Sequence, residues 1–134
     1  MSRTDTCSEP AVLVVEDEAL QRLDAVATVE AAGFQAIGVS NADEAISILE
    51  TRDDIRAMFT DVQIPGSMDG LALTRLVKNR WPKVATLVTS GKTTIAEADL
   101  PRGVPFFPKP YLPFQIQATL RHLIAGVPGT NGTA

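Results

Sequence analysis

Short runs of apolar residues alternate along the chain with segments in which apolar positions recur every three or four residues. The continuous runs are residues 11–15, 34–39, 55–60, 84–89 and 104–107. A short, unbroken apolar run of this kind is typical of a buried parallel strand. The segments between the runs have the spacing of amphipathic helices. The pattern therefore predicts strands that alternate with helices.

Residues that start or stop helices bound these segments. Asn41, with Ser40 before it, can cap a helix that extends to Glu50, and Gly33 suits the position just after a helix. Pro82 cannot continue the helix predicted before it. The predicted helices are residues 19–32, 41–50, 69–80 and 113–125, with a weaker stretch at 94–100. Strands alternating with helices imply an α/β fold, in which helices cover both faces of a parallel sheet.

The composition is typical of a single globular domain. With 134 residues, 45% hydrophobic and 21% charged, the chain is expected to form one domain over residues 11–125. Residues 1–10 are expected to be a disordered leader, and residues 126–134 a flexible tail. The net charge of −4 argues against nucleic-acid binding.

The sequence has no secretory signal and no membrane-spanning run, and it has a single cysteine; together these features predict a cytoplasmic protein. No apolar run approaches the roughly 20 residues that span a bilayer, and the first ten residues lack the apolar centre of a secretory signal. Cys7 is the only cysteine, so no internal disulfide can form. We therefore expect neither membrane insertion nor a secreted protein.

Charged residues follow three of the apolar runs. Glu16 and Asp17 come after the first run, Asp61 ends the third, and Lys109 follows the fifth. The carboxyl ends of parallel strands open on one edge of the sheet, where α/β folds bind ligands. Three carboxylates and one ammonium would then converge. Such a cluster points to a divalent cation and a phosphoryl group.

Each of these residues also has a simpler interpretation when taken alone. Glu16 and Asp17 could favour the positive end of the following helix, and Asp61 could cap a turn before Pro65. Lys109 could be an ordinary exposed lysine. A hydroxyl at the end of the fourth run, from Thr89 or Ser90, could bind a phosphoryl oxygen or serve only a turn.

Taken together, these segments resemble the receiver domain of two-component response regulators. The resemblance extends from residue 11 to about residue 125. It rests on the following motifs: Val14-Val15-Glu16-Asp17, Thr60-Asp61-Val62-Gln63-Ile64-Pro65, Met68-Asp69-Gly70, Thr89-Ser90-Gly91 and Lys109-Pro110. Each motif is weak alone, but their combination in this order is specific. The resemblance implies a doubly wound sheet of five parallel strands in the flavodoxin-like order 2-1-3-4-5.

The resemblance also implies a role for each matched acidic residue. Asp61 would be the phosphoacceptor, supplied by a histidine kinase or a histidine phosphotransfer protein. Mg²⁺ would be the cofactor, bound directly by Asp17 and Asp61, with Glu16 helping through water. The backbone carbonyl of Gln63 would complete the protein ligands.

Three further residues would sense the phosphoryl group. Lys109 would contact it, Ser90 would be the switch hydroxyl, and Phe106 would be the switch aromatic three residues before the lysine. Lys109-Pro110 is a candidate cis peptide bond that would aim the lysine. Phosphorylation would draw Ser90 toward Asp61 and let Phe106 reorient.

The chain departs from the usual receiver pattern at three places. The segment 65–70 is one residue longer than the usual loop, and counting with that insertion selects Ser90 over Thr89 as the switch residue. The stretch between Ser90 and Lys109 is short and contains Pro101, so the output surface would be irregular. Glu16 stands where an aspartate is more common.

The predicted function is a stand-alone response regulator that signals by protein contact, through an unknown target or a homodimer, and is not an enzyme. Two alternatives remain open. One is a receiver-like interaction module that works without phosphorylation. The other is a small Mg²⁺-dependent phosphatase, which would need a general acid or base near Asp61, where Val62 and Gln63 follow instead.

Overall fold

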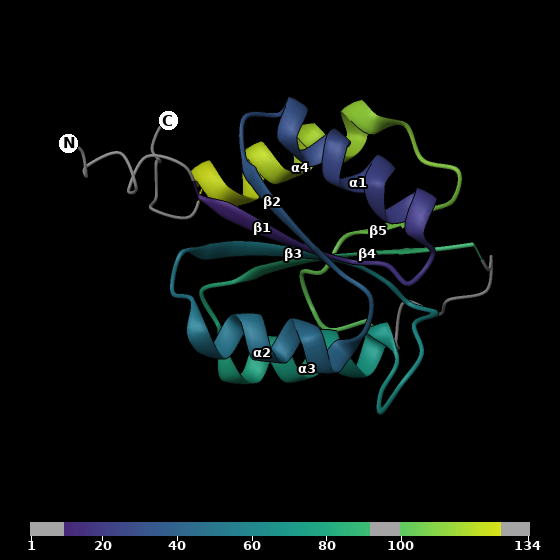
Figure 1. The fold of residues 1–134 in the computed structure, drawn as a ribbon. Coiled ribbons are helices and arrows are strands. Elements are labelled where there is room, and N and C mark those ends of the chain that lie inside the picture. The colour runs from purple at the N-terminus through teal and green to yellow at the C-terminus, as the bar shows by residue number, and fades with distance from the viewer. Residues whose placement is uncertain (1–9, 92–99, 127–134) are drawn as a thin grey trace.

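The computed structural model describes residues 10–91 and 100–126 as a three-layer α/β fold (Figure 1). Its strands are β1 (Ala11–Val15), β2 (Gln35–Val39), β3 (Ile55–Asp61), β4 (Ala85–Ser90) and β5 (Phe106–Pro108). They form one parallel sheet in the order β2-β1-β3-β4-β5. The predicted fold class and strand order are confirmed.

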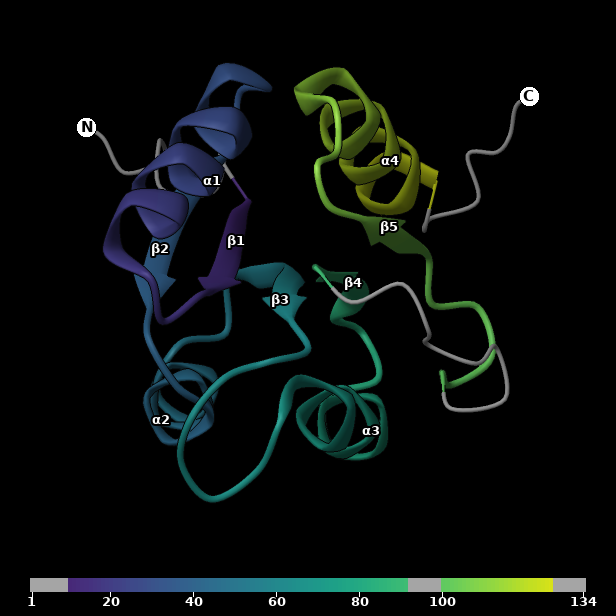
Figure 2. The same ribbon diagram turned by 90° about the vertical axis from the view of Figure 1, so that its right-hand side faces the viewer.

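Helices cover both faces of this sheet. The described helices are α1 (Ala19–Ala31), α2 (Ala42–Thr51), α3 (Gly70–Arg80) and α4 (Pro113–Gly126). Figure 2 shows α1 and α4 above the sheet and α2 and α3 below it. Alternate strand residues therefore enter different cores, as Leu13 packs on the side of α2 and α3 while Val12 and Val14 face α1 and α4.

The helix starts follow the capping residues of the sequence. Asn41 accepts a hydrogen bond from the backbone N–H of Glu44 at 2.9 Å, and Asp69 accepts one from Ala72 at 2.9 Å. Glu18 caps α1 in the same way through the N–H of Gln21. Each cap satisfies a backbone donor that would otherwise lack a partner.

The fifth strand begins later than predicted. The sequence pattern predicts it over residues 104–107, but the ladder covers Phe106–Pro108. Val104 instead donates its N–H to the carbonyl of Pro101 in a turn. Pro105 has no N–H to give to a ladder, although its carbonyl accepts from Val88 at 3.0 Å.

Three of the predicted segments fall almost wholly outside the described residues. They are the leader over 1–10, the helix over 94–100 and the tail over 126–134. No helix within residues 10–91 and 100–126 is long and apolar enough to cross a membrane.

Candidate functional site

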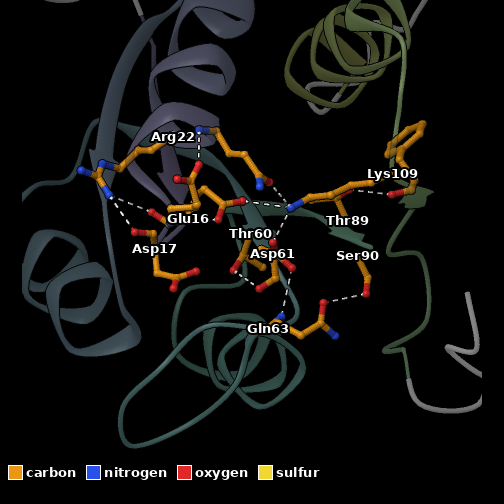
Figure 3. Close-up of polar contacts among 12 residues, drawn as sticks. Glu16, Asp17, Arg22, Thr60, Asp61, Gln63, Thr89, Ser90 and Lys109 are labelled. Carbon is orange, nitrogen blue, oxygen red and sulfur yellow. Dashed lines mark hydrogen bonds and ion pairs between the residues drawn. The ribbon is translucent and has the colours of Figure 1, made fainter. Parts of the chain in front are cut away.

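The charged residues that follow three separate strands meet at the carboxyl edge of the sheet. Lys109, just after β5, places Nζ 2.6 Å from Oδ2 of Asp61 and 3.1 Å from Oε1 of Glu16 (Figure 3). Asp61 is the last residue of β3, and Glu16 follows β1. The parallel sheet thus brings residues up to 93 positions apart into one cluster.

A glutamine completes the surroundings of the lysine. Lys109 Nζ donates a third hydrogen bond, 2.5 Å long, to Oε1 of Gln21 in the first turns of α1. An ammonium group has three N–H donors, so Asp61, Glu16 and Gln21 can accept all of them. The sequence pattern did not predict a role for Gln21, because this residue lies on α1 and reaches the crevice only through its long side chain.

Burial and charge oppose each other at this cluster. Burial disfavours the charged form of Lys109, but its hydrogen bonds and charge interactions with Asp61 and Glu16 outweigh that cost, so its pKa is raised. Burial also raises the pKa of Glu16, and the hydrogen bonds from Glu18 and Lys109 offset this only in part. The cluster therefore brings two carboxyl groups against one ammonium, and burial makes the one on Glu16 the easier to protonate.

Asp61 is held rigidly by the backbone around it. Its carboxylate is almost fully buried, and Oδ1 accepts the backbone N–H of Gln63 at 3.0 Å. The hydroxyl of Thr60 donates to the Asp61 carbonyl at 2.9 Å. A Cβ on Gly70, at the start of α3, would overlap that same carbonyl oxygen. Only glycine allows α3 to begin this close to the strand end.

Asp17 lies at the rim of the cluster and is exposed. Among the residues that the structure describes, its carboxylate has no hydrogen-bond or ion-pair partner, whereas its carbonyl accepts from Arg22 at 3.5 Å. Arg22 also donates to the carbonyl of Glu16 at 3.0 Å and so fixes the turn after β1. Its stem passes over Gly38 of β2, where a Cβ would lie 3.1 Å away. Sequence reasoning had no signal for Arg22.

The two neighbouring hydroxyls at the end of β4 point to different partners. Thr89 Oγ1 donates to the carbonyl of Phe107 at 2.7 Å, on the neighbouring strand. Ser90 Oγ donates to Oε1 of Gln63 at 2.9 Å, beside Asp61 (Figure 3). The geometry thus favours Ser90 over Thr89 as the hydroxyl that can serve the crevice, although its role as a switch stays a prediction.

Phe106 lies at the start of β5 and is half-buried. It packs against a small apolar cluster formed by Val62, Val88 and Val104. Since Val62 directly follows Asp61, this cluster connects the aromatic ring to the segment after Asp61. Its predicted role as a switch aromatic is not tested by this packing.

Comparisons with known proteins settle the family. A family model, the response regulator receiver domain, matches residues 12–120. The chain belongs to this family. It is 31% identical over 119 residues to the hydrogenase transcriptional regulatory protein HoxA of Cupriavidus necator, a match covering 84% of this chain and 24% of that protein. It is 28% identical over 128 residues to the sensor kinase CckA of Brucella abortus, covering 90% of this chain and 13% of the kinase.

Solved receivers share the fold. A response regulator receiver protein from Pseudomonas putida has a TM-score of 0.76 and 30% identity, covering 84% of this chain and 96% of that chain. One from Sinorhizobium medicae has a TM-score of 0.81 at 24% identity, covering 88% and 96%, which shows the fold alone. The receiver spans a quarter or less of the two curated relatives. Their whole-protein activities therefore do not carry over directly.

Receiver domains in general bind Mg²⁺ at the acidic edge, and the donor set here suits that ion. Glu16, Asp17 and Asp61 supply carboxylate oxygens, the ligand type that Mg²⁺ prefers. Within the described residues, no group of three or more His, Cys, Asp or Glu side chains is arranged as a metal centre. Lys109 contacts one carboxylate oxygen of Glu16 and one of Asp61.

A cavity of about 550 Å³ opens beside Lys109. Tyr111 forms one wall, with its ring packed edge-on against Phe59 at 5.5 Å between ring centres. Burial raises the pKa of the Tyr111 hydroxyl, so it stays protonated. The peptide bond between Lys109 and Pro110 is cis, as predicted, and Pro110 lines the same cavity.

Proposed function

We propose that this receiver accepts a phosphoryl group on Asp61 from a histidine kinase or a histidine phosphotransfer protein. The observation that carries the proposal is the buried Asp61 carboxylate, held 2.6 Å from the Lys109 ammonium at the carboxyl edge of the sheet. A carboxylate in such a position can act as a nucleophile. The neighbouring ammonium can then stabilise charge on the arriving phosphoryl oxygens.

The transfer step needs little from the protein beyond positioning. A carboxylate oxygen of Asp61 attacks the phosphorus of a phosphohistidine, a P–O bond forms, and the P–N bond breaks. The electron pair of that bond stays with the imidazole of the donor. The N–H of Gln63 holds Asp61 Oδ1, and Lys109 approaches the other oxygen, so the carboxylate is oriented before the donor arrives.

Mg²⁺ is the expected cofactor of this reaction. Asp17 and Asp61 would hold it directly, with Glu16 through water and with the carbonyl of Gln63. When bound, the ion neutralises charge on the phosphoryl oxygens. Two carboxyl groups share the one ammonium of Lys109, and the carboxylate of Asp17 is uncommitted within the described residues; both observations support this assignment.

The response would travel through Ser90 and Phe106. Ser90 would donate its hydroxyl proton to the phosphoryl group, and Phe106 would reorient in the apolar cluster beside Val62. The signal would then pass to a target protein, or to a second copy of this chain, in the cytoplasm.

Exposed apolar side chains on α1 and at the start of α4 suit contact with the phosphodonor protein. Leu20 and Leu23 on α1 are 74% and 64% exposed, and Leu112 and Phe114 at the start of α4 are 57% and 65% exposed. Figure 2 shows α1 and α4 on the same face of the sheet. Exposed apolar side chains that lie together typically mark a protein interaction site, and the phosphodonor protein would contact those of α1 and of the start of α4.

Incubation with acetyl phosphate and Mg²⁺, followed by intact-mass measurement, tests the proposal. Wild type should gain the mass of one phosphoryl group, and Asp61→Asn should gain none. Asp69→Asn is the matched control, because Asp69 is a cap outside the cluster. If wild type gains no phosphate and shows no response to beryllofluoride with Mg²⁺, phosphorylation is not the function.

A further inference from the structure

Gln63 contacts both the proposed phosphoacceptor and the proposed switch hydroxyl. Its backbone N–H donates to Asp61 Oδ1 at 3.0 Å, and its side-chain Oε1 accepts the hydroxyl of Ser90 at 2.9 Å. In Figure 3 its amide lies between the end of β4 and the segment after β3. Sequence reasoning considered only the carbonyl of Gln63, so the function of this side chain remains unassigned.

A hydroxyl carries a single proton to donate. In the structure, that proton of Ser90 is directed at Gln63. If Ser90 is to donate to a phosphoryl group on Asp61, the hydrogen bond to Gln63 must break first. The two states of Ser90 therefore compete for one proton.

We propose that the Gln63 side chain is a latch that holds Ser90 in the resting arrangement and releases it when Asp61 is phosphorylated. The proposal rests on the proposed function and describes how that same site is regulated. The latch weakens the response to phosphorylation and lowers the population of the active arrangement before phosphorylation.

Burial decides which of the two partners moves. Ser90 is fully buried, whereas Gln63 is exposed. Once released, the Gln63 amide can form hydrogen bonds with water, so breaking the latch does not leave a buried polar group unsatisfied. The Ser90 hydroxyl is shielded from water and must donate inside the protein, where the phosphoryl oxygens supply a new acceptor.

The strengths of the two hydrogen bonds determine the direction of the switch. The latch joins two neutral groups, whereas a hydrogen bond to a phosphoryl oxygen is charge-assisted and about twice as strong. Phosphorylation therefore overcomes the latch. Without the latch, activation should be easier by about two- to tenfold, the equivalent of about 0.5–1.5 kcal/mol for one neutral hydrogen bond.

A double-mutant cycle with beryllofluoride, which stands in for the phosphoryl group on Asp61, tests this latch. The readout is the NMR signal of the Gly91 amide, titrated at fixed Mg²⁺ in four proteins: wild type, Gln63→Leu, Ser90→Ala and the double variant. Gln63→Leu should lower the half-saturating concentration by about two- to tenfold. In the Ser90→Ala background the same substitution should have no effect.

Two further variants serve as controls. Gln63→Met keeps an unbranched side chain without an amide acceptor, so it should show the same tightening of about two- to tenfold and replaces Gln63→Leu if the leucine variant does not fold. Gln21→Leu removes the other glutamine amide of the crevice, the one that contacts Lys109. Its effect should be the same in the wild-type and Ser90→Ala backgrounds.

The possible failures are distinguishable. No response of wild type to beryllofluoride overturns the proposed function and the latch together. A wild-type response without tighter binding in either Gln63 variant overturns the latch alone. Equal tightening in the wild-type and Ser90→Ala backgrounds also overturns it, because Gln63 would then act without Ser90.

Discussion

Ion pairs of the same length lie at both edges of the sheet, but their surroundings differ. Lys109–Asp61 at the carboxyl edge and Arg52–Asp54 at the amino edge both measure 2.6 Å. The side chain of Asp61 is 6% exposed, whereas that of Asp54 is 36% exposed. Water screens the second pair, so its loss should matter little, while the first leaves buried charge behind when broken. The distance between the charged atoms alone therefore does not tell which ion pair contributes more to stability.

The backbone is also more closely packed at the carboxyl edge than at the amino edge, as two glycines show. Gly70, at the carboxyl edge, is surrounded by the backbone of Asp61 and Val62. Gly33, which follows α1 at the amino edge, has a φ of 98°, but a Cβ added there would meet nothing within 4 Å. The carboxyl edge is therefore packed against neighbouring backbone, whereas the amino edge is constrained only by local conformation.

Alanine at these two glycines should give the largest contrast in stability. Gly70→Ala should lower the free energy of unfolding by about 3 kcal/mol, because backbone cannot move aside easily. Gly33→Ala should cost only about 1 kcal/mol, for the left-handed conformation. Urea unfolding measures both values. Equal losses would show that close packing does not distinguish the two edges.

Removal of the cation from each ion pair should give the next largest difference. Lys109→Met should lower the free energy of unfolding by about 2 kcal/mol, because Asp61 and Glu16 then face each other without a buried cation. Lys109 is 23% exposed, which keeps the loss below that of a fully buried pair. Arg52→Met should cost less than about 1 kcal/mol. A larger loss for Arg52→Met would contradict the ranking by burial.

Mg²⁺ should stabilise only the carboxyl edge. At an ion concentration about ten times Kd, binding to the folded state should raise the free energy of unfolding by about 1.4 kcal/mol. Asp17→Asn should abolish most of that gain, while Asp53→Asn at the amino edge, whose side chain is also exposed, should retain it. Thermal unfolding with Mg²⁺ and with EDTA measures the gain. A gain that survives Asp17→Asn would place the ion elsewhere.

The strand pattern predicted the main parts of this site because parallel strands end on one edge. Asp61 and Lys109 are each placed by the end of a strand, and the pattern of apolar residues predicts where the strands end. Gln21 and Arg22 could not be found in this way, since both reach the crevice through long side chains on α1. Their direction depends on tertiary neighbours such as Gly38. Apolar periodicity places Cα atoms on elements, but it carries no signal for where a flexible polar side chain ends.

The same limit applies to the choice between Thr89 and Ser90. Counting residues through the longer loop selects Ser90, but the count says nothing about which hydroxyl faces the crevice. That depends on the pleat of β4, which turns Thr89 toward the carbonyl of Phe107 on β5. The start of β5 was also beyond prediction, because it depends on the turn between Pro101 and Val104.

The smallest expected effects concern pH: the change of stability with pH should have opposite signs at the two edges. Burial raises the pKa of Glu16 above its ordinary 4.5, so the folded protein binds the proton more tightly than the unfolded chain. Stability should therefore fall as pH rises from 4.5 through the folded pKa. The hydrogen bond from Arg52 lowers the pKa of Asp54 below its ordinary 3.8. The stability from Asp54 is thus present above pH 3.8 and lost as pH falls through its folded pKa.

Two neutral substitutions separate these contributions. Relative to wild type and without divalent metal, Glu16→Gln should gain stability with increasing pH, because it lacks the raised carboxyl pKa. Asp54→Asn should lose relative stability over the acidic range where Asp54 ionises, because the variant cannot form the ion pair with Arg52. Urea unfolding across the acidic range measures both differences. Differences of the same sign would mean that burial does not govern Glu16, and that the two edges are electrostatically alike.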